Sequence, residues 1–331
     1  MDTAVIRLDP AAPDPGGIRR AAEVIRAGGL VAFPTETVYG LGANALDPAA
    51  VARIFAAKGR PATNPLIVHV ADPDQVLTVA ADWPEAAAAL AARFWPGPLT
   101  IVVPKRPGVP DAVTAGGPTV AVRCPAHAVA RALIRAAGVP VAAPSANRSN
   151  ELSPTRAEHV LKGLNGRIEM LLDGGPCPGG IESTVVDVTG SAVRVLRPGL
   201  ITAPMLEAVV GPVSASHGGN AAGVPARSPG QVAKHYSPRT PLILARNADE
   251  ADGLHRDLMK AGLRVISVGF DLIFEYRPMD GDPAGYAADL YAVLHDLDDG
   301  RYDRIVVELP PDTPEWAGVR DRLLRAGSPG T

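Results

Sequence analysis

Residues 30–70 decide the fold and read LVAFPTETVYGLGANALDPAAVARIFAAKGRPATNPLIVHV. The apolar run at 30–33 predicts a short strand that Pro34 ends, because proline has no backbone N–H with which to continue the pairing. A polar loop with two glycines then covers residues 35–42. Small hydroxyl side chains and glycines let a ligand approach the backbone closely. This loop is therefore the first candidate for a binding site.

The second half of the stretch predicts a helix and a further strand. Asp47 is placed to cap the helix, Pro48 suits its first turn, and the helix is expected to end at Lys58. Residues 66–70 are apolar apart from one histidine and predict a strand. Strands that alternate with helices are typical of a layered α/β domain.

The same alternation continues on both sides of this stretch, up to about residue 210. Because the connections vary in length, we expect a mixed rather than a purely parallel sheet, in a domain over residues 1–210. The expected elements are helices at 19–27, 84–94, 126–137 and 156–161, strands at 99–103, 119–123, 139–142 and 168–172, and a hairpin of 183–188 with 192–196.

The composition changes after residue 210. Eight of the twenty residues from 211 to 230 are glycine or proline, which predicts a linker, assigned to residues 211–240. Residues 241–331 predict a small Rossmann-like α/β domain. Its expected strands are 241–245, 264–268 and 304–308, and its expected helices are 249–261, 284–297 and 314–325.

Composition excludes several classes of protein for this 331-residue chain. With 32 Lys and Arg against 35 Asp and Glu, the net charge of -3 excludes a protein drawn onto nucleic acid by its overall field. A hydrophobic content of 47% excludes global disorder. Two cysteines exclude a disulfide framework and a four-cysteine zinc site, and indicate a reducing compartment. The sequence shows no signal peptide and no membrane span, so we expect a cytoplasmic protein.

One dinucleotide-like motif is present, and it lies in the wrong context. Residues 40–45 read GLGANA and fit G-x-G-x-x-A, but six residues separate them from the preceding strand. The acidic residue expected about 20 positions further on is replaced by Lys58 and Arg60. The chain also lacks a P-loop, H-E-x-x-H, C-x-x-C and G-x-S-x-G. Serine-nucleophile and zinc-hydrolase functions therefore have no support in the sequence.

Lys58 and Arg60 stand on either side of a glycine, before a segment held by two prolines. A rigid pair of cations suits phosphate oxygens, with lysine as a point charge and arginine as a planar fork. The alternative is a helix C-terminus whose lysine only complements the helix dipole. The surrounding pattern favours phosphate binding.

Two further arginines end apolar strands. Arg123 is followed by Cys124 and Pro125, and Arg197 is followed by Pro198. At a strand end, an arginine can point into a site and bind a carboxylate or phosphate. The alternative for each is an arginine that faces solvent. Cys124 is read as a small buried side chain rather than a nucleophile.

Hydroxyl, amide and glycine residues cluster after two other strands. Ser145 and Asn147 follow the strand at 139–142, at the edge where open α/β sheets bind ligands. Gly179 and Gly180 precede Ser183, and here the glycines would permit close approach. A turn that only caps the first segment, and a plain hairpin for the second, remain the alternatives.

The linker carries chemistry that is unusual for a flexible tether. It contains SPG at 228–230 and KHYSP at 234–238. This segment is interpreted either as a lid that folds over a pocket of the first domain or as a segment that docks the two domains.

Taken together, these motifs resemble the YrdC-type threonylcarbamoyl-AMP synthases, in the long form with an additional C-terminal domain. The resemblance covers nearly the whole chain. The matching stretches are FPTETVYGL at 33–41, KGRP at 58–61, NPL at 64–66, PSAN at 144–147, ESTVVD at 182–187, LRPG at 196–199, SPG at 228–230 and HYSP at 235–238.

The resemblance implies a YrdC-like twisted mixed-sheet domain with a concave basic pocket. It also implies the joining of L-threonine, bicarbonate and ATP into L-threonylcarbamoyl-AMP, with release of pyrophosphate and with Mg²⁺ on the ATP phosphates. No covalent enzyme intermediate and no redox cofactor are expected. The product would supply the tRNA threonylcarbamoyl-transfer machinery, and stable nucleic-acid or membrane binding is not expected.

The same resemblance assigns roles to individual residues. Lys58 and Arg60 are the expected catalytic residues. The expected ATP-binding residues are Lys58, Arg60, Ala62, Asn64, Thr119, Ser145, Asn147, Ser153, Arg197 and Tyr236. The expected threonine-binding residues are Thr35, His69, Arg123, Ala143 and Ser183. His69 has a structural alternative as a buried core histidine.

Two other functions stay open on the sequence. One is an RNA-binding module that uses the same concave surface without nucleotide turnover. The low aromatic content of 4% argues against the stacking platforms that such a module uses. The other is a carbamoyl-adenylate enzyme that acts on a different acceptor.

Overall fold

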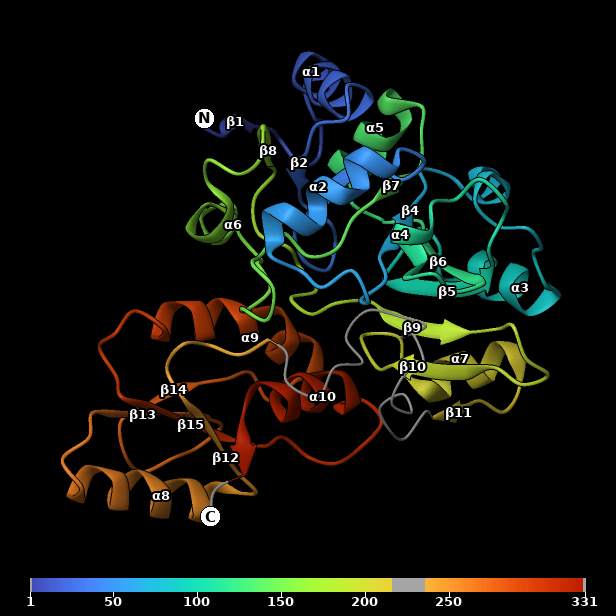
Figure 1. The fold of residues 1–331 in the computed structure, drawn as a ribbon. Helices are drawn as coiled ribbons and strands as arrows, with labels where there is room; N and C mark the ends of the chain where they lie inside the picture. The colour runs from blue at the N-terminus through green and yellow to red at the C-terminus, as the bar shows by residue number, and fades with distance from the viewer. Residues whose placement is uncertain (1, 216–235, 330–331) are drawn as a thin grey trace.

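Two β-sheets, each covered by helices, organise the chain in the computed structural model, which describes residues 2–215 and 236–329 (Figure 1). Within these ranges, no helix has the length and apolar character needed to cross a membrane. Most of the linker motif at 228–238 lies outside the described residues; its described part begins at Tyr236.

The first sheet is mixed, as expected. The central strands β4 and β6 run parallel, β5 runs antiparallel to β6, and β9 runs parallel to β5. In spatial order the strands are β1 (Ala4–Arg7), β8 (Met170–Asp173), β2 (Val31–Phe33), β3 (Gly40–Asn44), β7 (Val141–Ala142), β4 (Ile67–His69), β6 (Thr119–Arg123), β5 (Leu99–Pro104), β9 (Thr184–Asp187), β10 (Arg194–Arg197) and β11 (Ser214–Ala215).

The helix before the Lys58 segment forms as predicted. The Asp47 carboxylate accepts a hydrogen bond from the Ala49 N–H at 2.9 Å, and Gly59 ends the helix with a φ of 62°. The helical elements of this domain are α1 (Pro15–Arg26), α2 (Pro48–Lys58), a 3₁₀ helix (Pro73–Thr78), α3 (Glu85–Phe94), α4 (Asp111–Thr114), α5 (Ala128–Ala137), α6 (Ala157–Leu164) and α7 (Ala203–Val210).

The expectation of a loop over the whole of residues 35–42 is wrong. Gly40 begins strand β3, which pairs antiparallel with β2. A side chain on Gly42 would place its Cβ 2.7 Å from the ring of Phe33, so glycine is required where this strand passes the ring. The sequence pattern hid the strand because GLGAN carries none of the β-branched or aromatic residues that mark strands.

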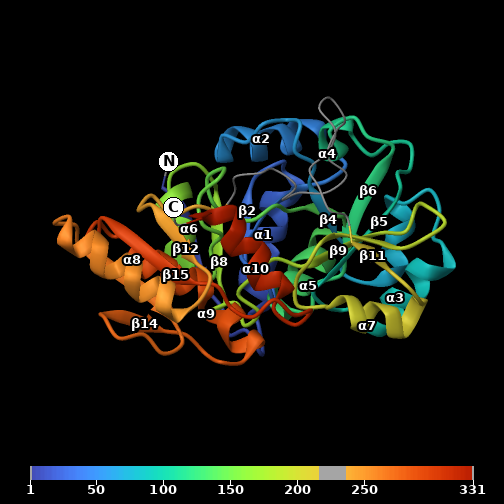
Figure 2. The same ribbon diagram turned by 90° about the horizontal axis from the view of Figure 1, so that it is seen from below.

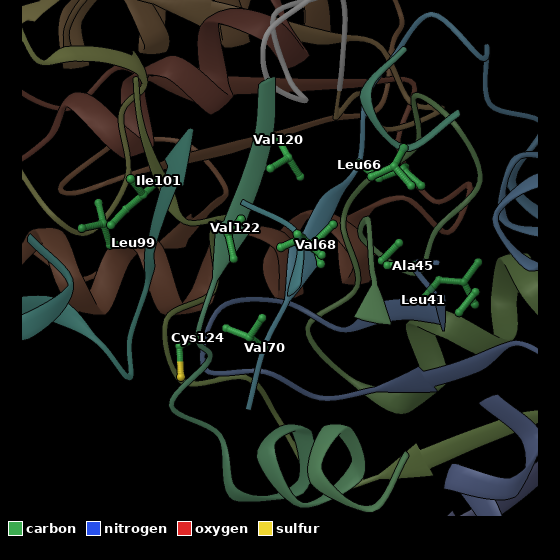
Figure 3. Close-up of a cluster of buried hydrophobic side chains, with 14 of the residues drawn as sticks. Leu41, Ala45, Leu66, Val68, Val70, Leu99, Ile101, Val120, Val122 and Cys124 are labelled. Atoms are coloured by element: carbon green, nitrogen blue, oxygen red, sulfur yellow. The ribbon is translucent and has the colours of Figure 1, made fainter. Parts of the chain in front are cut away.

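The core lies on the helix-covered face of the central strands. Val68 of β4, Ile101 of β5, and Val120 and Val122 of β6 belong to one buried cluster (Figure 3). Because side chains alternate along a strand, the intervening residues of these strands face the opposite side of the sheet. That second face holds a smaller apolar cluster and ends in polar side chains.

The second sheet is wholly parallel in its described pairings. Its strands in spatial order are β14 (Tyr276–Pro278), β13 (Val265–Gly269), β15 (Arg304–Glu308), β12 (Leu242–Ala245) and β16 (Ser328–Pro329), with helices α8 (Ala248–Lys260), α9 (Pro283–Leu297) and α10 (Ala317–Ala326). Figures 1 and 2 both show α8 on the outer side of this sheet, while α9 and α10 lie toward the first domain.

The two domains share one hydrophobic cluster. Val38 and Ile181 of the first domain belong to the same buried set as Tyr291 and Trp316 of the second. The contact with α9 requires glycine at residue 180, where φ is +69° and a Cβ would lie 1.9 Å from a backbone carbonyl oxygen of α9. This glycine was expected to allow close approach; the structure shows that the approaching group is the second domain.

Candidate active site

A pocket opens where several strands of the first sheet end. Strands β4 and β6 are parallel with His69 opposite Arg123, so both side chains emerge at the same edge. Ala143 follows β7, which runs antiparallel to β4, so it lies beside Ile67 at the start of β4, where its N–H donates to the Ile67 carbonyl at 2.9 Å. All of these residues line the pocket, which therefore extends from the carboxyl ends of β4 and β6 back along β4.

Neighbouring strands bring a second group of residues to the same pocket. Ser183 immediately precedes β9, and its hydroxyl lies 2.7 Å from the Thr100 hydroxyl on β5. Arg197 ends β10 and donates from Nε to the Ser183 carbonyl at 3.0 Å and from Nη2 to the Ser183 hydroxyl at 3.2 Å. The β9–β10 hairpin therefore holds Arg197 and Ser183 as one unit.

Among the described residues, three buried guanidinium groups line this pocket: those of Arg60, Arg123 and Arg197. Arg60 donates to the carbonyl oxygens of Asn64 and Pro65 at 3.2 and 2.9 Å. Burial lowers the pKa of Arg60 to about 10 and lowers that of Arg197, yet Arg60 stays protonated at neutral pH. The pocket is therefore built to receive negative charge.

Arg123 is held in place before any substrate arrives. Its Nη2 donates to the Thr37 hydroxyl at 2.9 Å and lies 2.7 Å from a Glu36 carboxylate oxygen, and its Nε donates to the Gly97 carbonyl at 3.3 Å. Thr37 also lines the pocket and is bonded to Thr35. The hydroxyl-rich loop of the first sequence stretch thus fixes the arginine that was assigned to the threonine carboxylate.

His69 is neutral in the pocket. Burial, together with the charge of Arg123, lowers its pKa to about 3. Its Nδ1 has no hydrogen-bond partner among the described residues. A neutral imidazole beside a guanidinium can accept a hydrogen bond from a small hydroxylated ligand.

Lys58 lies behind the pocket rather than on its surface. Its ammonium donates to the carbonyl oxygens of Ser145 and Asn147 at 2.6 and 2.5 Å and to the Asn147 Oδ1 at 3.0 Å. Burial, and secondarily the charge of Arg60, lowers its pKa well below the usual value. Since all three donors have acceptors, Lys58 shapes the loop after β7 in this conformation.

The remaining assigned residues divide between the pocket wall and its surroundings. Ser145 and Tyr236 line the pocket, and Ser145 donates to the Asn147 Oδ1 at 2.6 Å. Asn147 and Asn64 are buried beside the pocket, and Ala62 is exposed. Two further residues lie outside the pocket lining: Thr119 at the opposite end of β6 from Arg123, and Ser153, whose hydroxyl donates to Glu182.

Tyr236 belongs to the segment assigned to the linker and contributes to the pocket. It is buried, lines the pocket, and has a φ of +64°, a left-handed conformation that is unusual for a bulky residue. Its ring lies 5.9 Å from the ring of Tyr291 on α9. This residue of the assigned linker is thus held against both the pocket and the second domain.

The sequence interpretation missed one carboxylate of the pocket and its partners. Glu182 lines the pocket, and Arg322 of α10 pairs with it at 2.7 Å. Burial raises the pKa of Glu182, but the charges of Arg322 and Arg197 outweigh it and lower the pKa to about 2. A signal existed: Arg322 falls on the apolar stripe formed by Val319, Leu323 and Ala326.

Groups of three or more His, Cys, Asp or Glu side chains that could hold a metal ion are absent from the ranges 2–215 and 236–329. The pocket carboxylate of Glu182 is engaged by Arg322 and Tyr291, and Glu36 is engaged by Arg123.

Comparison with known proteins covers both domains. The Sua5/YciO/YrdC family profile, described as "Telomere recombination", matches residues 23–199, and the profile described as "Threonylcarbamoyl-AMP synthase, C-terminal domain" matches residues 201–328. The threonylcarbamoyl-AMP synthase of Bacillus subtilis is 43% identical over 319 residues, which cover 93% of this chain and 92% of that protein. That of Schizosaccharomyces pombe is 37% identical over 347 residues, covering 90% and 85%.

A solved structure agrees over the same length. The crystal structure of Pyrococcus abyssi Sua5 complexed with L-threonine superposes with a TM-score of 0.93 and 40% identity, covering 98% of this chain and 97% of that chain. This agreement confirms the expected α/β fold with an additional C-terminal domain.

Proposed function

The chain belongs to the threonylcarbamoyl-AMP synthase family, whose members are nucleotidyltransferases, and from that premise we propose that its pocket joins L-threonine, bicarbonate and ATP into L-threonylcarbamoyl-AMP and releases pyrophosphate. The observation that carries the proposal is the convergence of Arg60, Arg123 and Arg197 on one pocket. Both a carboxylate and a polyphosphate are anions, so joining them in one cavity requires several fixed cations.

The threonine subsite lies around Arg123 and His69 in this proposal. Arg123 receives the carboxylate, because its guanidinium lines the pocket and is already oriented by Thr37. His69 and Thr35 face the hydroxyl side, and Ala143 leaves room for a small side chain. The relative from P. abyssi, whose structure holds L-threonine, supports a threonine site in this fold.

The ATP phosphates lie toward Arg60 and Arg197, on the side of the pocket that Ser145 lines. Arg197 donates a hydrogen bond to Ser183, and Ser183 was assigned to the threonine subsite. The hydrogen-bonded pair of Arg197 and Ser183 therefore spans the two subsites. Mg²⁺ enters with ATP, as part of that substrate.

The reaction needs positioning more than a protein nucleophile. The threonine amine adds to the carbon of bicarbonate and water leaves, which gives a carbamate. A carbamate oxygen then attacks the α-phosphorus, the bond to the bridging oxygen breaks, and pyrophosphate leaves with that electron pair. Fixed guanidiniums stabilise the charge that develops on the phosphate oxygens.

The cysteines of the chain suit this mechanism. Cys124 and Cys177 are both buried. Burial raises the pKa of Cys124 to about 11 and raises that of Cys177, so both stay as thiols at neutral pH. Neither cysteine is thus placed as a nucleophile, and the proposal assigns attack on the α-phosphorus to the carbamate. Its product would be consumed in the cytoplasm by the machinery that transfers the threonylcarbamoyl group to tRNA adenosine next to the anticodon.

The test is pyrophosphate release by the purified protein with MgATP, when L-threonine and bicarbonate are each supplied or omitted. Release that requires both substrates, with an adenylate of threonine carbamate identified by mass spectrometry, is the expected result. Release that is indifferent to L-threonine would overturn the proposal. Tight RNA binding without any release would favour the RNA-binding alternative.

A further inference from the structure

We propose that Arg322, contributed by the second domain, is a positioning residue for the ATP side of the pocket: it fixes Arg197 and Ser183 by holding the residues next to them. This inference rests on the function proposed above. It assigns the C-terminal domain a part in building the site, in addition to any part in covering it.

Arg322 is the largest fully buried side chain of the described residues, with 0% exposure. Its Nε donates to a Glu182 carboxylate oxygen at 2.7 Å, and its Nη2 donates to the Glu182 carbonyl at 3.1 Å. Its Nη1 donates to the Pro198 carbonyl at 3.0 Å and to the Asp321 carboxylate at 2.7 Å. The guanidinium therefore binds two separate segments of the first domain at once.

Those two segments carry pocket residues. Glu182 directly precedes Ser183, and Pro198 directly follows Arg197. Arg197 and Ser183 are in turn bonded to each other at 3.0 and 3.2 Å. Arg322 thus closes a ring of hydrogen bonds whose inner members face the ligand, although it does not line the pocket.

Glu182 has further partners that fit this role. It accepts hydrogen bonds from the Ser153 hydroxyl and from the Tyr291 hydroxyl, the latter at 3.2 Å. The Arg322 guanidinium also lies 5.6 Å from the ring centre of Tyr236. The N–H donors of the guanidinium point in fixed, separate directions and reach two carboxylates and two carbonyl oxygens here. The three donors of a lysine ammonium leave from one nitrogen and cannot reach all four acceptors, so lysine is not an equivalent replacement.

The simpler explanation is that Arg322 only attaches the second domain to the first. The two explanations differ in which substrate binds more weakly once Arg322 is replaced. A mere attachment site would lower thermal stability, or lower the affinities for both substrates alike. A positioning residue acting through Arg197 would weaken ATP binding more than L-threonine binding, because the threonine subsite loses only the support of Ser183 and keeps Arg123, whose partners do not include Arg322.

The experiment compares Arg322→Lys with the full-length wild type by thermal unfolding, by calorimetric binding of L-threonine and of a non-hydrolysable ATP analogue, and by steady-state kinetics. Arg322→Lys keeps a positive charge opposite the Glu182 carboxylate but removes the planar guanidinium and its separately directed N–H donors. We expect a roughly tenfold to hundredfold fall in kcat/KM for ATP and weaker analogue binding, with a smaller fall, of at most about threefold, in L-threonine affinity through Ser183.

Arg320→Lys is the matched control. Arg320 lies on the same helix, but it donates to the Pro310 carbonyl and pairs with the exposed Asp312, both within the second domain. It should leave both affinities unchanged. Tyr291→Phe is the milder second variant, for use if Arg322→Lys does not fold. It removes the Tyr291 hydroxyl, which donates to the Glu182 carboxylate, and should weaken ATP binding about threefold.

Folded Arg322→Lys with wild-type ATP affinity and KM would overturn the proposal, as would equal losses for both substrates. Failure of the proposed function is separable from this result, because analogue binding does not depend on turnover. If the wild type binds ATP but forms no threonylcarbamoyl-AMP, a selective loss of analogue binding in Arg322→Lys would still support the positioning role.

Discussion

Replacing Arg123 by lysine should weaken L-threonine binding while leaving the protein folded. Lysine retains the positive charge that the Glu36 carboxylate requires, since among the described residues this carboxylate is paired with the Arg123 guanidinium, at 2.7 Å, and accepts no other hydrogen bond. The substitution removes the planar guanidinium, which donates to the Thr37 hydroxyl at 2.9 Å and to the Gly97 carbonyl at 3.3 Å. A removal of the charge itself would leave a buried, unpaired carboxylate and confuse binding with unfolding.

The size of the effect follows from the bonds that lysine cannot replace. A hydrogen bond to a charged group contributes about 1.5–3 kcal/mol. At about 1.4 kcal/mol for each factor of ten, the loss of one such bond to the threonine carboxylate corresponds to a roughly 10- to 150-fold rise in the dissociation constant. The affinity for an ATP analogue should change by less than about threefold, because Arg60 and Arg197 keep their partners.

Isothermal titration calorimetry with L-threonine measures this directly, and thermal unfolding verifies the fold. Arg194→Lys is the matched control, because Arg194 pairs at 2.8 Å with the buried Asp187 in the same sheet but does not line the pocket. The control should bind L-threonine as the wild type does. A folded Arg123→Lys protein with wild-type threonine affinity would refute the assignment of Arg123 to the carboxylate.

Three further predictions concern the surroundings of the pocket. Lys58→Ala removes the donor of three hydrogen bonds to the loop after β7. The melting temperature should therefore fall, and the rate of pyrophosphate release should fall roughly tenfold to a hundredfold. Wild-type values of both quantities would contradict this prediction. Gly180→Ala should destabilise the protein by about 2–6 kcal/mol in denaturant unfolding, because a Cβ at a φ of +69° would meet a carbonyl oxygen of α9. Gly253→Ala on α8, whose Cβ would meet only the end of the Arg256 side chain at 3.8 Å, should not destabilise it. His159 and His295 stack across the domain interface at 3.9 Å, and burial lowers their pKa values to about 3 and about 4. The unfolded chain therefore binds more protons below about pH 6.5, so stability should fall as pH drops from about 6.5 to 4, by at most about 1.4 kcal/mol per pH unit for each histidine, and a flat melting temperature over this window would refute the argument.

Much of the framework around the site was predictable because local rules determine it. The helix from Pro48 to Lys58 begins at a capping aspartate and ends at a left-handed glycine, and both signals are visible in the sequence. Arg123 and Arg197 end strands, and the parallel register of β4 and β6 then brings Arg123 beside His69. Strand ends that share one edge of a sheet place their side chains together, even when the sequence separates them widely.

The parts that escaped prediction depend on contacts between distant residues. Strand β3 forms because its glycines fit against Phe33, which no local propensity indicates. Phosphate binding by Lys58 stays a prediction, but the contacts of its ammonium with a loop almost ninety residues away could not be read from the sequence. Arg322 is separated from Glu182 by 140 residues, so only its place on the apolar stripe of α10 could have drawn attention to it.

An isotope experiment can show whether the carbamate carbon of the adenylate comes from bicarbonate, as the proposed reaction requires. The protein would be incubated with MgATP, L-threonine and [¹³C]bicarbonate, and the adenylate would be analysed by mass spectrometry. The account predicts an adenylate of threonine carbamate that carries one ¹³C atom from bicarbonate. An unlabelled threonyl-adenylate, formed equally well without bicarbonate, would show that the threonine carboxylate is the attacking group and would contradict the account.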